Sequence, residues 1–287
     1  MGPSGTPSPT TAAEQWATAL GTWAIPPAIL AAAPESPWGY APALFARRAE
    51  AALAQHTPSA DIAQAALPAG GAVLDVGCGA GAASLPLAGP AALLVGVDPS
   101  PELLAIFEER ARALGVRVLA LRGQWPAIAA ETPVADVVVC HHVAYNVADL
   151  APFVVALTRH ARRRVVLELT ARHPLSDLND LWLRFHGLVR PQEPGADDAV
   201  AVLRELGLAP ERRDWTAAGS GVGDGFATPD DLVAWTRRRL CLPVLRDPEI
   251  AATLAEQLGP DPATWQLPPR RLVTLWWPGG AGSAAAP

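Results

Sequence analysis

The sequence has few cysteines and no lysine. Its three cysteines, Cys78, Cys140 and Cys241, are far apart and odd in number, so they offer neither the paired spacing of a zinc site nor a disulfide framework. A reducing cytoplasm is the expected location. All 22 basic residues are arginine, which we attribute to a GC-rich genome and not to function.

The chain also lacks an excess of positive charge and long apolar segments. Its formal net charge is −6, and nucleic-acid-binding proteins usually carry a basic patch, so nucleic acid is not expected as a partner. No apolar run reaches the length of a membrane span, and residues 1–11 have neither the positive start nor the apolar core of a leader. Neither export nor membrane insertion is expected.

What the chain does contain is enough apolar sequence for a large core. Half of its residues are apolar (50%), which favours one large domain with appendages. Residues 1–11 and 278–287 are rich in Gly, Pro, Ser, Thr or Ala and are expected to be disordered tails. Residues 12–68 predict an interrupted helical lid, here called the N-terminal segment, ahead of a main domain at 69–277.

From residue 71 onward, apolar strands alternate with helices. Strands are expected at 72–76, 91–97, 117–121, 135–140, 164–169, 211–216 and 272–276, and helices at 82–88, 101–114, 148–161, 176–186, 197–206, 229–240 and 247–258. Such alternation predicts an α/β fold with a Rossmann-like, doubly wound, mostly parallel seven-stranded sheet. Residues of about 172–208, where the rhythm changes, are expected to form a cap inserted between the fifth and sixth strands.

Residues 73–81 combine an apolar strand with three alternate glycines, Gly77, Gly79 and Gly81. Glycine is needed where a side chain would block a ligand or where φ is positive, so the pattern indicates a cofactor across this loop. Two cofactor classes compete. The spacing Gly-x-Gly-x-x-Ala, with Asp98 after the second strand, also satisfies the NAD fingerprint.

An acid at Asp75 and the third glycine complete the pattern acid-x-Gly-x-Gly-x-Gly. On this pattern the chain resembles the class I S-adenosylmethionine (SAM) dependent methyltransferases. The run Val-Gly-Val-Asp-Pro-Ser-Pro-Glu-Leu at 95–103 resembles that family's second motif, and the likeness covers about residues 71–169. The resemblance implies SAM as the cofactor.

The resemblance also implies roles for individual residues. Asp75 and the glycine loop, which includes Cys78, would hold the methionine part of SAM. Asp98 would bind the ribose hydroxyls, since each carboxylate oxygen accepts a hydrogen bond, and Pro99 would lie against adenine.

Polar residues follow the third and fourth strands. Gln124 falls where the family places a polar residue for the adenine amino group, and Trp125 either covers the adenine ring or fills the core. The fourth strand ends in Cys-His-His at 140–142, and ligands bind beyond the carboxyl ends of parallel strands. If the extended geometry continues, His141 and His142 face opposite sides, with His141 lining SAM and His142 facing the acceptor.

The same stretch bears on metal dependence. Some quinone and RNA-end methyltransferases carry Glu-x-x-Glu-His here, and those side chains hold a divalent metal. In this chain the matching positions are His142, Tyr145 and Asn146, which removes the hard oxygen ligands that magnesium prefers. No metal is therefore expected, and the alternative is a softer site of His142 with His173 or His186.

Histidines are the candidate catalytic groups. Methyl transfer mainly needs alignment and a dry pocket, but a hydroxyl acceptor also needs a base. Histidine, with an unperturbed pKa of about 6.5, suits that role. The candidates are His142, His173 and His186, each also open to a structural role, with Tyr145 as an orienting hydroxyl. Glu168, near the end of the fifth strand, binds a polar acceptor or caps a neighbour.

The N-terminal segment and the cap supply aromatic residues. In similar small-molecule methyltransferases such segments close over the substrate, although tryptophan at helical spacing is more often core. The candidate substrate-binding residues are Trp38, Tyr40 and Trp182.

The sequence thus predicts a cytoplasmic class I SAM-dependent methyltransferase that acts on a small molecule, with oxygen as the acceptor atom. The alternatives are a nucleic-acid or protein methyltransferase and a non-catalytic SAM- or NAD-binding protein. The identity of the acceptor and the oligomeric state are not encoded in any motif of the chain.

Overall fold

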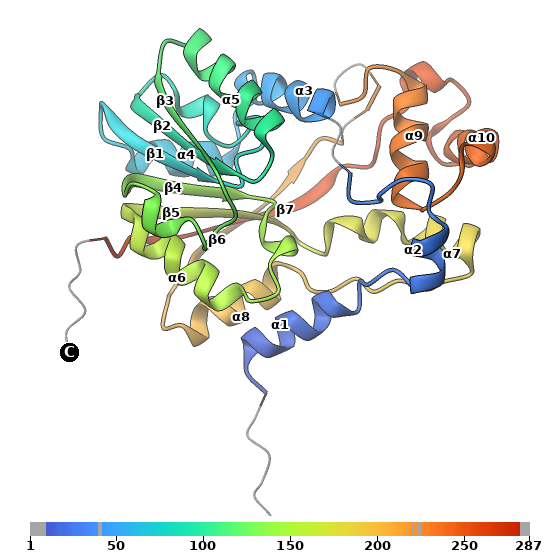
Figure 1. The fold of residues 1–287 in the computed structure, drawn as a ribbon, viewed down its shortest axis with the longest axis horizontal. Helices are drawn as coiled ribbons and strands as arrows, with labels where there is room; N and C mark the ends of the chain where they lie inside the picture. Colours follow the sequence, from blue (N-terminus) through green and yellow to red (C-terminus); the bar gives the residue numbers. More distant parts are fainter. Residues whose placement is uncertain (1–9, 40–41, 220, 223–224, 282–287) are drawn as a thin grey trace, which may run out of the picture.

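The computed structural model describes residues 10–39, 42–219, 221–222 and 225–281. Its strands are β1 (Gly71–Val76), β2 (Ala91–Asp98), β3 (Arg117–Arg122), β4 (Ala135–His141), β5 (Ala161–Thr170), β6 (Glu211–Ala217) and β7 (Arg270–Pro278). They form one sheet in the order β3-β2-β1-β4-β5-β7-β6. Strands β1 to β5 pair in parallel, and β7 runs antiparallel to β5 and β6. The predicted mostly parallel, seven-stranded fold is confirmed (Figure 1).

Helices flank this sheet. The α-helices are α1 (Ala12–Gly21), α2 (Pro27–Ala32), α3 (Pro42–Leu53), α4 (Pro58–Ala66), α5 (Pro101–Ala113), α6 (Leu150–His160), α7 (Asn179–His186), α8 (Ala196–Glu205), α9 (Pro229–Arg239) and α10 (Asp247–Leu258). The 3-10 helices are η1 (Leu85–Leu87), η2 (Ala129–Glu131), η3 (Ala144–Asn146), η4 (Pro174–Leu178), η5 (Val244–Arg246) and η6 (Pro262–Thr264).

Each face of the sheet has its own apolar cluster, because successive side chains of a strand point to opposite faces. Val73 of β1 and Phe107 of α5 belong to the cluster under α3, α4 and α5. Leu74 of β1 and Trp16 of α1 belong to the cluster under α1, α6 and α8. The sheet is thereby covered on both sides, as its nearly unbroken apolar strands predicted.

A third apolar cluster lies beyond one edge of the sheet and includes Leu44, Trp182, Leu232, Ile250 and Trp265. Its members come from the N-terminal segment, α7, α9 and α10, which group together in Figure 1. The chain enters this region after β5 and again after β6, and it leaves the region into β7. The region therefore lies over the carboxyl ends of the parallel strands. We call it the cap.

Two expected elements differ from the structure. The helix expected at 82–88 is only a turn followed by η1, because Gly81 has a φ of +94° and the Gly-Pro pair at 89–90 ends the segment before β2. Helix α8, expected within the inserted cap, packs instead on the sheet through Ala199 and Leu203. The cap also draws on residues between β6 and β7.

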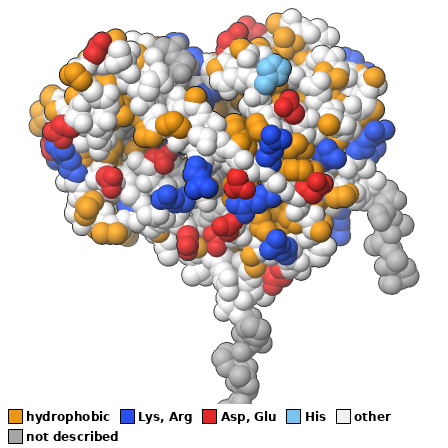
Figure 2. Space-filling model, turned by 180° about the vertical axis from the view of Figure 1, so that it is seen from behind, with side chains coloured by type: hydrophobic (Ala, Val, Ile, Leu, Met, Phe, Trp, Pro, Cys, Tyr) orange, Lys and Arg blue, Asp and Glu red, His pale blue; other side chains and the backbone are white. Residues whose placement is uncertain are grey.

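The surface carries mixed charge on the face turned away from the viewer in Figure 1. Figure 2 shows arginine side chains interspersed with acidic ones on that face. Some pairs also join distant segments: Arg237 of α9 lies 2.9 Å from Glu35 of the N-terminal segment and 2.8 Å from Asp247. Among the residues described above, no helix is both long and apolar enough to cross a membrane.

Candidate active site

The glycine loop turns sharply at the carboxyl end of β1. Gly77, Gly79 and Gly81 have φ values of +72°, +50° and +94°, in the left-handed region that favours glycine. A Cβ atom on Gly77 would stand 2.4 Å from Cγ2 of Val143, and one on Gly81 would stand 2.7 Å from Cδ2 of Phe107. The glycines therefore let the segment after β4 and helix α5 approach the loop closely.

Asp75 lies beneath this loop and is 1% exposed. Its Oδ2 accepts a hydrogen bond of 2.6 Å from the hydroxyl of Ser84. Burial raises the pKa of Asp75 to about 7 against the effect of that hydrogen bond, and the negative charge of Asp98 adds to the increase. Asp75 supports the loop from inside, and its contact with the methionine part of SAM stays a prediction.

Asp98 ends β2 and fastens the glycine loop to it. Its Oδ2 accepts a hydrogen bond of 2.9 Å from the Gly79 N–H, and its Oδ1 accepts one of 2.9 Å from the Ser100 N–H. A carboxylate oxygen accepts more than one hydrogen bond, so capacity for ribose hydroxyls is left. Cys78 is 5% exposed and its side chain belongs to the core, so its backbone and not its thiol forms the loop.

The residues expected near adenine differ in environment. Gln124 is exposed and, with Asp149, lines a groove of about 300 Å³. Trp125 borders the same groove but is 6% exposed, and its Nε1 donates to the Phe153 carbonyl at 3.3 Å. These contacts favour a core position for Trp125 over the alternative, a contact with adenine. Pro99 is exposed after β2, and the adenine contacts of Pro99 and Gln124 stay predictions.

His141, His142 and Glu168 form a polar centre at the ends of β4 and β5. Nε2 of His142 lies 2.9 Å from Oε1 of Glu168, and Nδ1 of His141 lies 4.0 Å from the same oxygen. Burial raises the pKa of Glu168, but the neighbouring His141 and the hydrogen bonds from His142 and Ser59 outweigh burial and bring this pKa to about 2. Glu168 is therefore an ionised acceptor of hydrogen bonds.

The prediction that His141 and His142 face opposite sides is wrong. Strand β4 ends at His141, and His142 has a left-handed φ of +61°, which breaks the alternation and turns the second imidazole back to Glu168. The His142 N–H also donates to the Glu168 carbonyl at 2.9 Å. The side chain of His142 is 46% exposed. Such backbone strain in a non-glycine residue concentrates at functional sites.

Tyr145 and His173, both predicted as catalytic groups, are held in structural contacts. The Tyr145 hydroxyl donates to the Thr170 carbonyl at 2.6 Å, and burial raises the pKa of this hydroxyl. His173 is 5% exposed and stacks on Trp23 with 3.7 Å between ring centroids. Burial and then the positive charge of Arg190 lower the pKa of His173 to about 3. These contacts favour the structural alternative for both residues, and their catalytic roles stay predictions.

His186 ends α7 inside the cap, where its contacts also favour the structural alternative, and its catalytic role stays a prediction. Its Nε2 lies 2.7 Å from the Leu240 carbonyl, and its ring packs 4.7 Å from that of Trp182. His142, His173 and His186 thus contact different partners, and the alternative metal site is not formed from them. Within the described ranges, no group of three or more His, Cys, Asp and Glu side chains is arranged to hold a metal ion.

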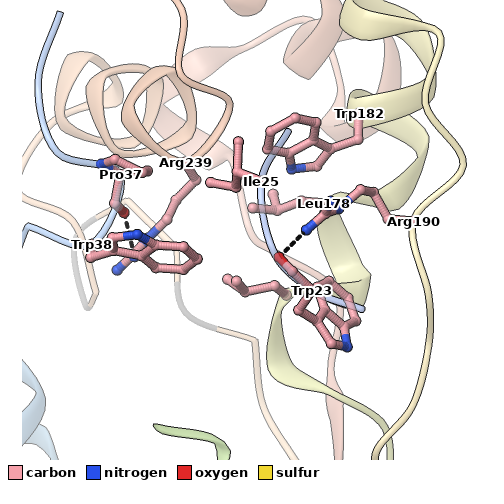
Figure 3. A pocket seen from close by; sticks show the side chains of 9 residues that line it. Trp23, Ile25, Pro37, Trp38, Leu178, Trp182, Arg190 and Arg239 are labelled. Atoms are coloured by element: carbon pink, nitrogen blue, oxygen red, sulfur yellow. Dashed lines mark hydrogen bonds between the residues drawn. The ribbon is translucent and has the colours of Figure 1, made fainter. Parts of the chain in front are cut away.

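Trp38 and Trp182, predicted to bind substrate, line one narrow pocket of the cap (Figure 3). The pocket encloses about 10 Å³, which is about the room that one water molecule needs. Arg190 donates to the Trp23 carbonyl at 2.5 Å, and its guanidinium carbon lies 4.9 Å from the Trp182 ring centroid. This arginine ties the N-terminal segment to the cap. Tyr40, the third predicted substrate residue, lies outside the described residues.

The residues around the glycine loop fit SAM. Asp98, next to the loop, retains capacity to accept hydrogen bonds. In the part of the chain that the structure describes, buried Nε2 of His141 and Oδ1 of Asp75 have no hydrogen-bond partner. Unpaired buried polar atoms are costly, so these two are suited to the polar groups of a ligand.

Two residues of this site escaped the sequence analysis. The Ser59 hydroxyl donates to Oε2 of Glu168 at 2.5 Å and lies 2.6 Å from the Thr274 hydroxyl. Glu168 and Thr274 each interrupt the apolar run of a strand, and a buried polar residue needs a partner, which is the signal that was available. Ser59 carried no such signal, because α4 reaches the site only through the tertiary fold.

Comparison with known sequences identifies the domain. Residues 73–164 match the family model described as a methyltransferase domain. The ubiquinone biosynthesis O-methyltransferase of Azorhizobium caulinodans is 40% identical over 81 residues, which are 28% of this chain and 32% of that protein. The protein of the same name from Rhizobium rhizogenes is 30% identical over 156 residues, which are 47% of this chain and 62% of that protein. The chain spans less than two thirds of the length of these relatives.

Solved structures share the fold. The YcgJ protein of Bacillus subtilis has a TM-score of 0.52 at 20% identity, over 80% of this chain and 98% of that one. A putative methyltransferase of Bacillus halodurans has a TM-score of 0.52 at 16% identity, over 78% of this chain and 99% of that one. At such identities the likeness concerns the fold alone. The chain therefore contains a methyltransferase domain over residues 73–164, within a fold that these solved structures share.

Proposed function

We propose that the chain transfers the methyl group of SAM to an oxygen atom of a small-molecule acceptor, with His142 as the general base. The observation that carries the proposal is the 2.9 Å contact between Nε2 of His142 and Glu168. Val143, the next residue, packs on Gly77 of the glycine loop, so base and loop are neighbours.

The cofactor side of the proposal uses the residues of the loop. Bound SAM supplies a methyl group on a positively charged sulfur. We propose that the glycine loop holds its methionine part, that Asp98 accepts from the ribose hydroxyls, and that buried Nε2 of His141 meets one of its polar groups. Gln124 is the proposed partner of the adenine amino group.

The proposed role of His142 as a base depends on which of its ring nitrogens carries a proton. Glu168 accepts a hydrogen bond at Nε2, so the neutral imidazole has its lone pair at Nδ1. Nδ1 takes the hydroxyl proton of the acceptor while the acceptor oxygen gains the methyl group, and S-adenosylhomocysteine leaves. The negative charge of Glu168 stabilises the imidazolium until His142 returns the proton to water.

Two observations favour a small acceptor and an oxygen atom. The relatives reported above carry the name of oxygen methyltransferases, and the net charge of −6 offers little attraction to a polyanion. Because the stretch at 142–146 lacks carboxylates, we also propose that turnover needs no divalent metal and persists in a chelator.

The test of the base replaces His142 by asparagine, which tolerates a positive φ better than alanine does. We expect His142→Asn to retain its affinity for SAM and to lose about 10²- to 10⁴-fold in kcat, the usual contribution of a general base. Exposed His56→Asn is the matched control and should leave kcat unchanged. Unaltered turnover of His142→Asn would remove this residue from the mechanism.

The acceptor and the cofactor are tested separately. A screen that follows S-adenosylhomocysteine release across phenols, sugars, acids and amines should respond to a hydroxyl compound. Calorimetry with SAM, S-adenosylhomocysteine and NAD should show binding of the first two. Tight NAD binding without a response to SAM would refute the proposal, and SAM binding without turnover of any acceptor would favour a non-catalytic role.

A further inference from the structure

A continuous row of polar side chains crosses three strands of the otherwise apolar sheet. His141 of β4 pairs in register with Glu168 of β5, and Glu168 pairs in register with Thr274 of β7. In-register neighbours point to the same face of a sheet. That face is covered by α4, which contacts β4, β5 and β7 (Figure 1) and brings Ser59 onto the row.

Hydrogen bonds join Glu168 and Thr274 of this row to neighbouring side chains in one chain. The Trp215 Nε1–H of β6 donates to the Thr274 hydroxyl at 3.0 Å, and the Thr274 and Ser59 hydroxyls are 2.6 Å apart. Ser59 lies 2.5 Å from Oε2 of Glu168, whose Oε1 meets His142. Ser59 and Thr274 are both 0% exposed, so water does not compete for these bonds.

The chemistry of Trp215 at one end of the chain and of Glu168 at the other sets the direction of every hydrogen bond between them. The Trp215 indole nitrogen is a donor only, and an ionised carboxylate is an acceptor only. Ser59 has one hydroxyl proton, which it gives to Glu168, so Thr274 must give its own proton to Ser59. Each donor in the chain therefore points towards Glu168.

The direction of these hydrogen bonds determines which contact Glu168 makes with His142. With Oε2 supplied by Ser59, Glu168 presents Oε1 as an acceptor to Nε2–H of His142. We propose that Ser59, Thr274 and Trp215 are positioning residues, which keep Glu168 an acceptor and thereby hold His142 in the tautomer with a bare Nδ1. The inference rests on the proposed function only where it concerns turnover.

The direct test measures the tautomer and needs no acceptor. We expect the ¹⁵N spectrum of the neutral His142 imidazole to show a protonated Nε2 and a bare Nδ1. Thr274→Val removes the donor to Ser59 and should shift the spectrum towards a mixture of tautomers. Thr274→Ser restores a hydroxyl and should restore the single tautomer. Trp215→Phe should act in the same direction as Thr274→Val, but more weakly.

The control is Thr253→Val. Thr253 is equally buried, at 0% exposure, but its hydroxyl donates to the Glu249 carbonyl within α10. We expect this variant to lose some stability while the His142 spectrum stays that of the parent. An identical tautomer in folded Thr274→Val and in the parent would overturn the inference, as would a parent spectrum with a bare Nε2.

Kinetics then separate this inference from the proposed function. If the methyl transfer proceeds as proposed, Thr274→Val should lose about tenfold in kcat, with KM and the affinity for S-adenosylhomocysteine unchanged, because Ser59, the donor to Glu168, loses its own hydrogen-bond donor and only the base is affected. A parent protein without SAM-dependent turnover would refute the proposed function, while the tautomer measurement would still decide the positioning role. Loss of affinity together with kcat would indicate a general structural defect and count against positioning.

Discussion

At the residue scale, single backbone conformations determine how the site is built. The left-handed φ of His142 directs its imidazole to Glu168, although the strand pattern predicts the opposite side. The left-handed glycines of the loop have a second role besides ligand approach, because Val143 and Phe107 occupy the space that their side chains would fill. A sequence motif records the glycine but not which of these constraints requires it.

The cost of a side chain at Gly77 is a first prediction. Gly77→Ala combines a φ of +72° with a Cβ only 2.4 Å from Val143, so we expect a loss of more than about 3 kcal/mol in the free energy of unfolding and loss of SAM binding. Gly70→Ala is the matched control, since Gly70 has a φ of +71° with no atom within 4 Å of the added Cβ. It should cost about 1–2 kcal/mol in urea unfolding. Equal losses in the two variants would exclude the clash.

Asp75 gives a prediction of pH dependence. Its pKa in the folded protein is about 7, above the ordinary value of 3.8, so the folded state binds a proton that the unfolded state releases. The resulting stability is fully present below about pH 4 and is lost as pH rises through about 7. Asp75→Asn keeps an oxygen for Ser84 and removes the buried charge. We expect the Tm of the unmodified protein to fall more than that of Asp75→Asn between about pH 5 and about pH 8. Parallel pH profiles would contradict the buried, raised pKa.

At the element scale, the N-terminal helices are part of the core. Trp16 of α1 is 0% exposed, its Nε1 donates to the Val147 carbonyl at 2.8 Å, and its ring stacks 5.8 Å from that of Tyr145. Helix α4 likewise contributes Ser59 to the polar row. The N-terminal segment was predicted as a helical lid, which stays a prediction, and the structure shows its helices packed on both faces of the sheet.

The two tryptophans of the N-terminal segment should therefore differ in importance. We expect Trp16→Ala to destabilise the fold by about 3–5 kcal/mol, because it empties a fully buried site and leaves the Val147 carbonyl unpaired. Trp38→Ala, at a residue that is 47% exposed, should cost less than about 1 kcal/mol. Urea unfolding checks both. A larger cost at Trp38 would place that residue in the core instead of at the pocket edge.

At the scale of the whole molecule, a Rossmann-like sheet and a cap meet at the carboxyl ends of the parallel strands. The glycine loop, Asp98 and the Glu168 centre all lie at that edge, and cap and sheet have separate apolar clusters. A ligand at the glycine loop binds the folded state and not the unfolded chain, so its affinity adds to stability.

Ligand-induced stabilisation follows from this arrangement. S-adenosylhomocysteine at about 100 times its Kd should add about 2.7 kcal/mol to the free energy of unfolding. Asp98→Ala removes the proposed ribose acceptor and the acceptor of the Gly79 N–H, so we expect it to abolish most of this gain. Thermal unfolding with and without ligand measures the difference, with Asp230→Ala, at an exposed position of α9, as a control that retains the gain. An undiminished ligand shift in Asp98→Ala would contradict its proposed role.

The seven strands, the mostly parallel sheet and the glycine loop were predictable from the sequence, because strand and helix periodicity and the spacing of glycines are local properties of a chain. The catalytic candidates were not separable in this way. His142, His173 and His186 look alike in the sequence, and burial against Trp23 or a bond to Leu240 sets two of them apart.

Only the tertiary structure decided which histidine meets Glu168 and which hydroxyls support that acid. Ser59, Glu168 and Thr274 are separated by more than 100 residues each, and they meet because α4 packs across the β5 and β7 strands. Hydrogen-bond direction and burial depend on such packing, and no periodicity in the sequence records it.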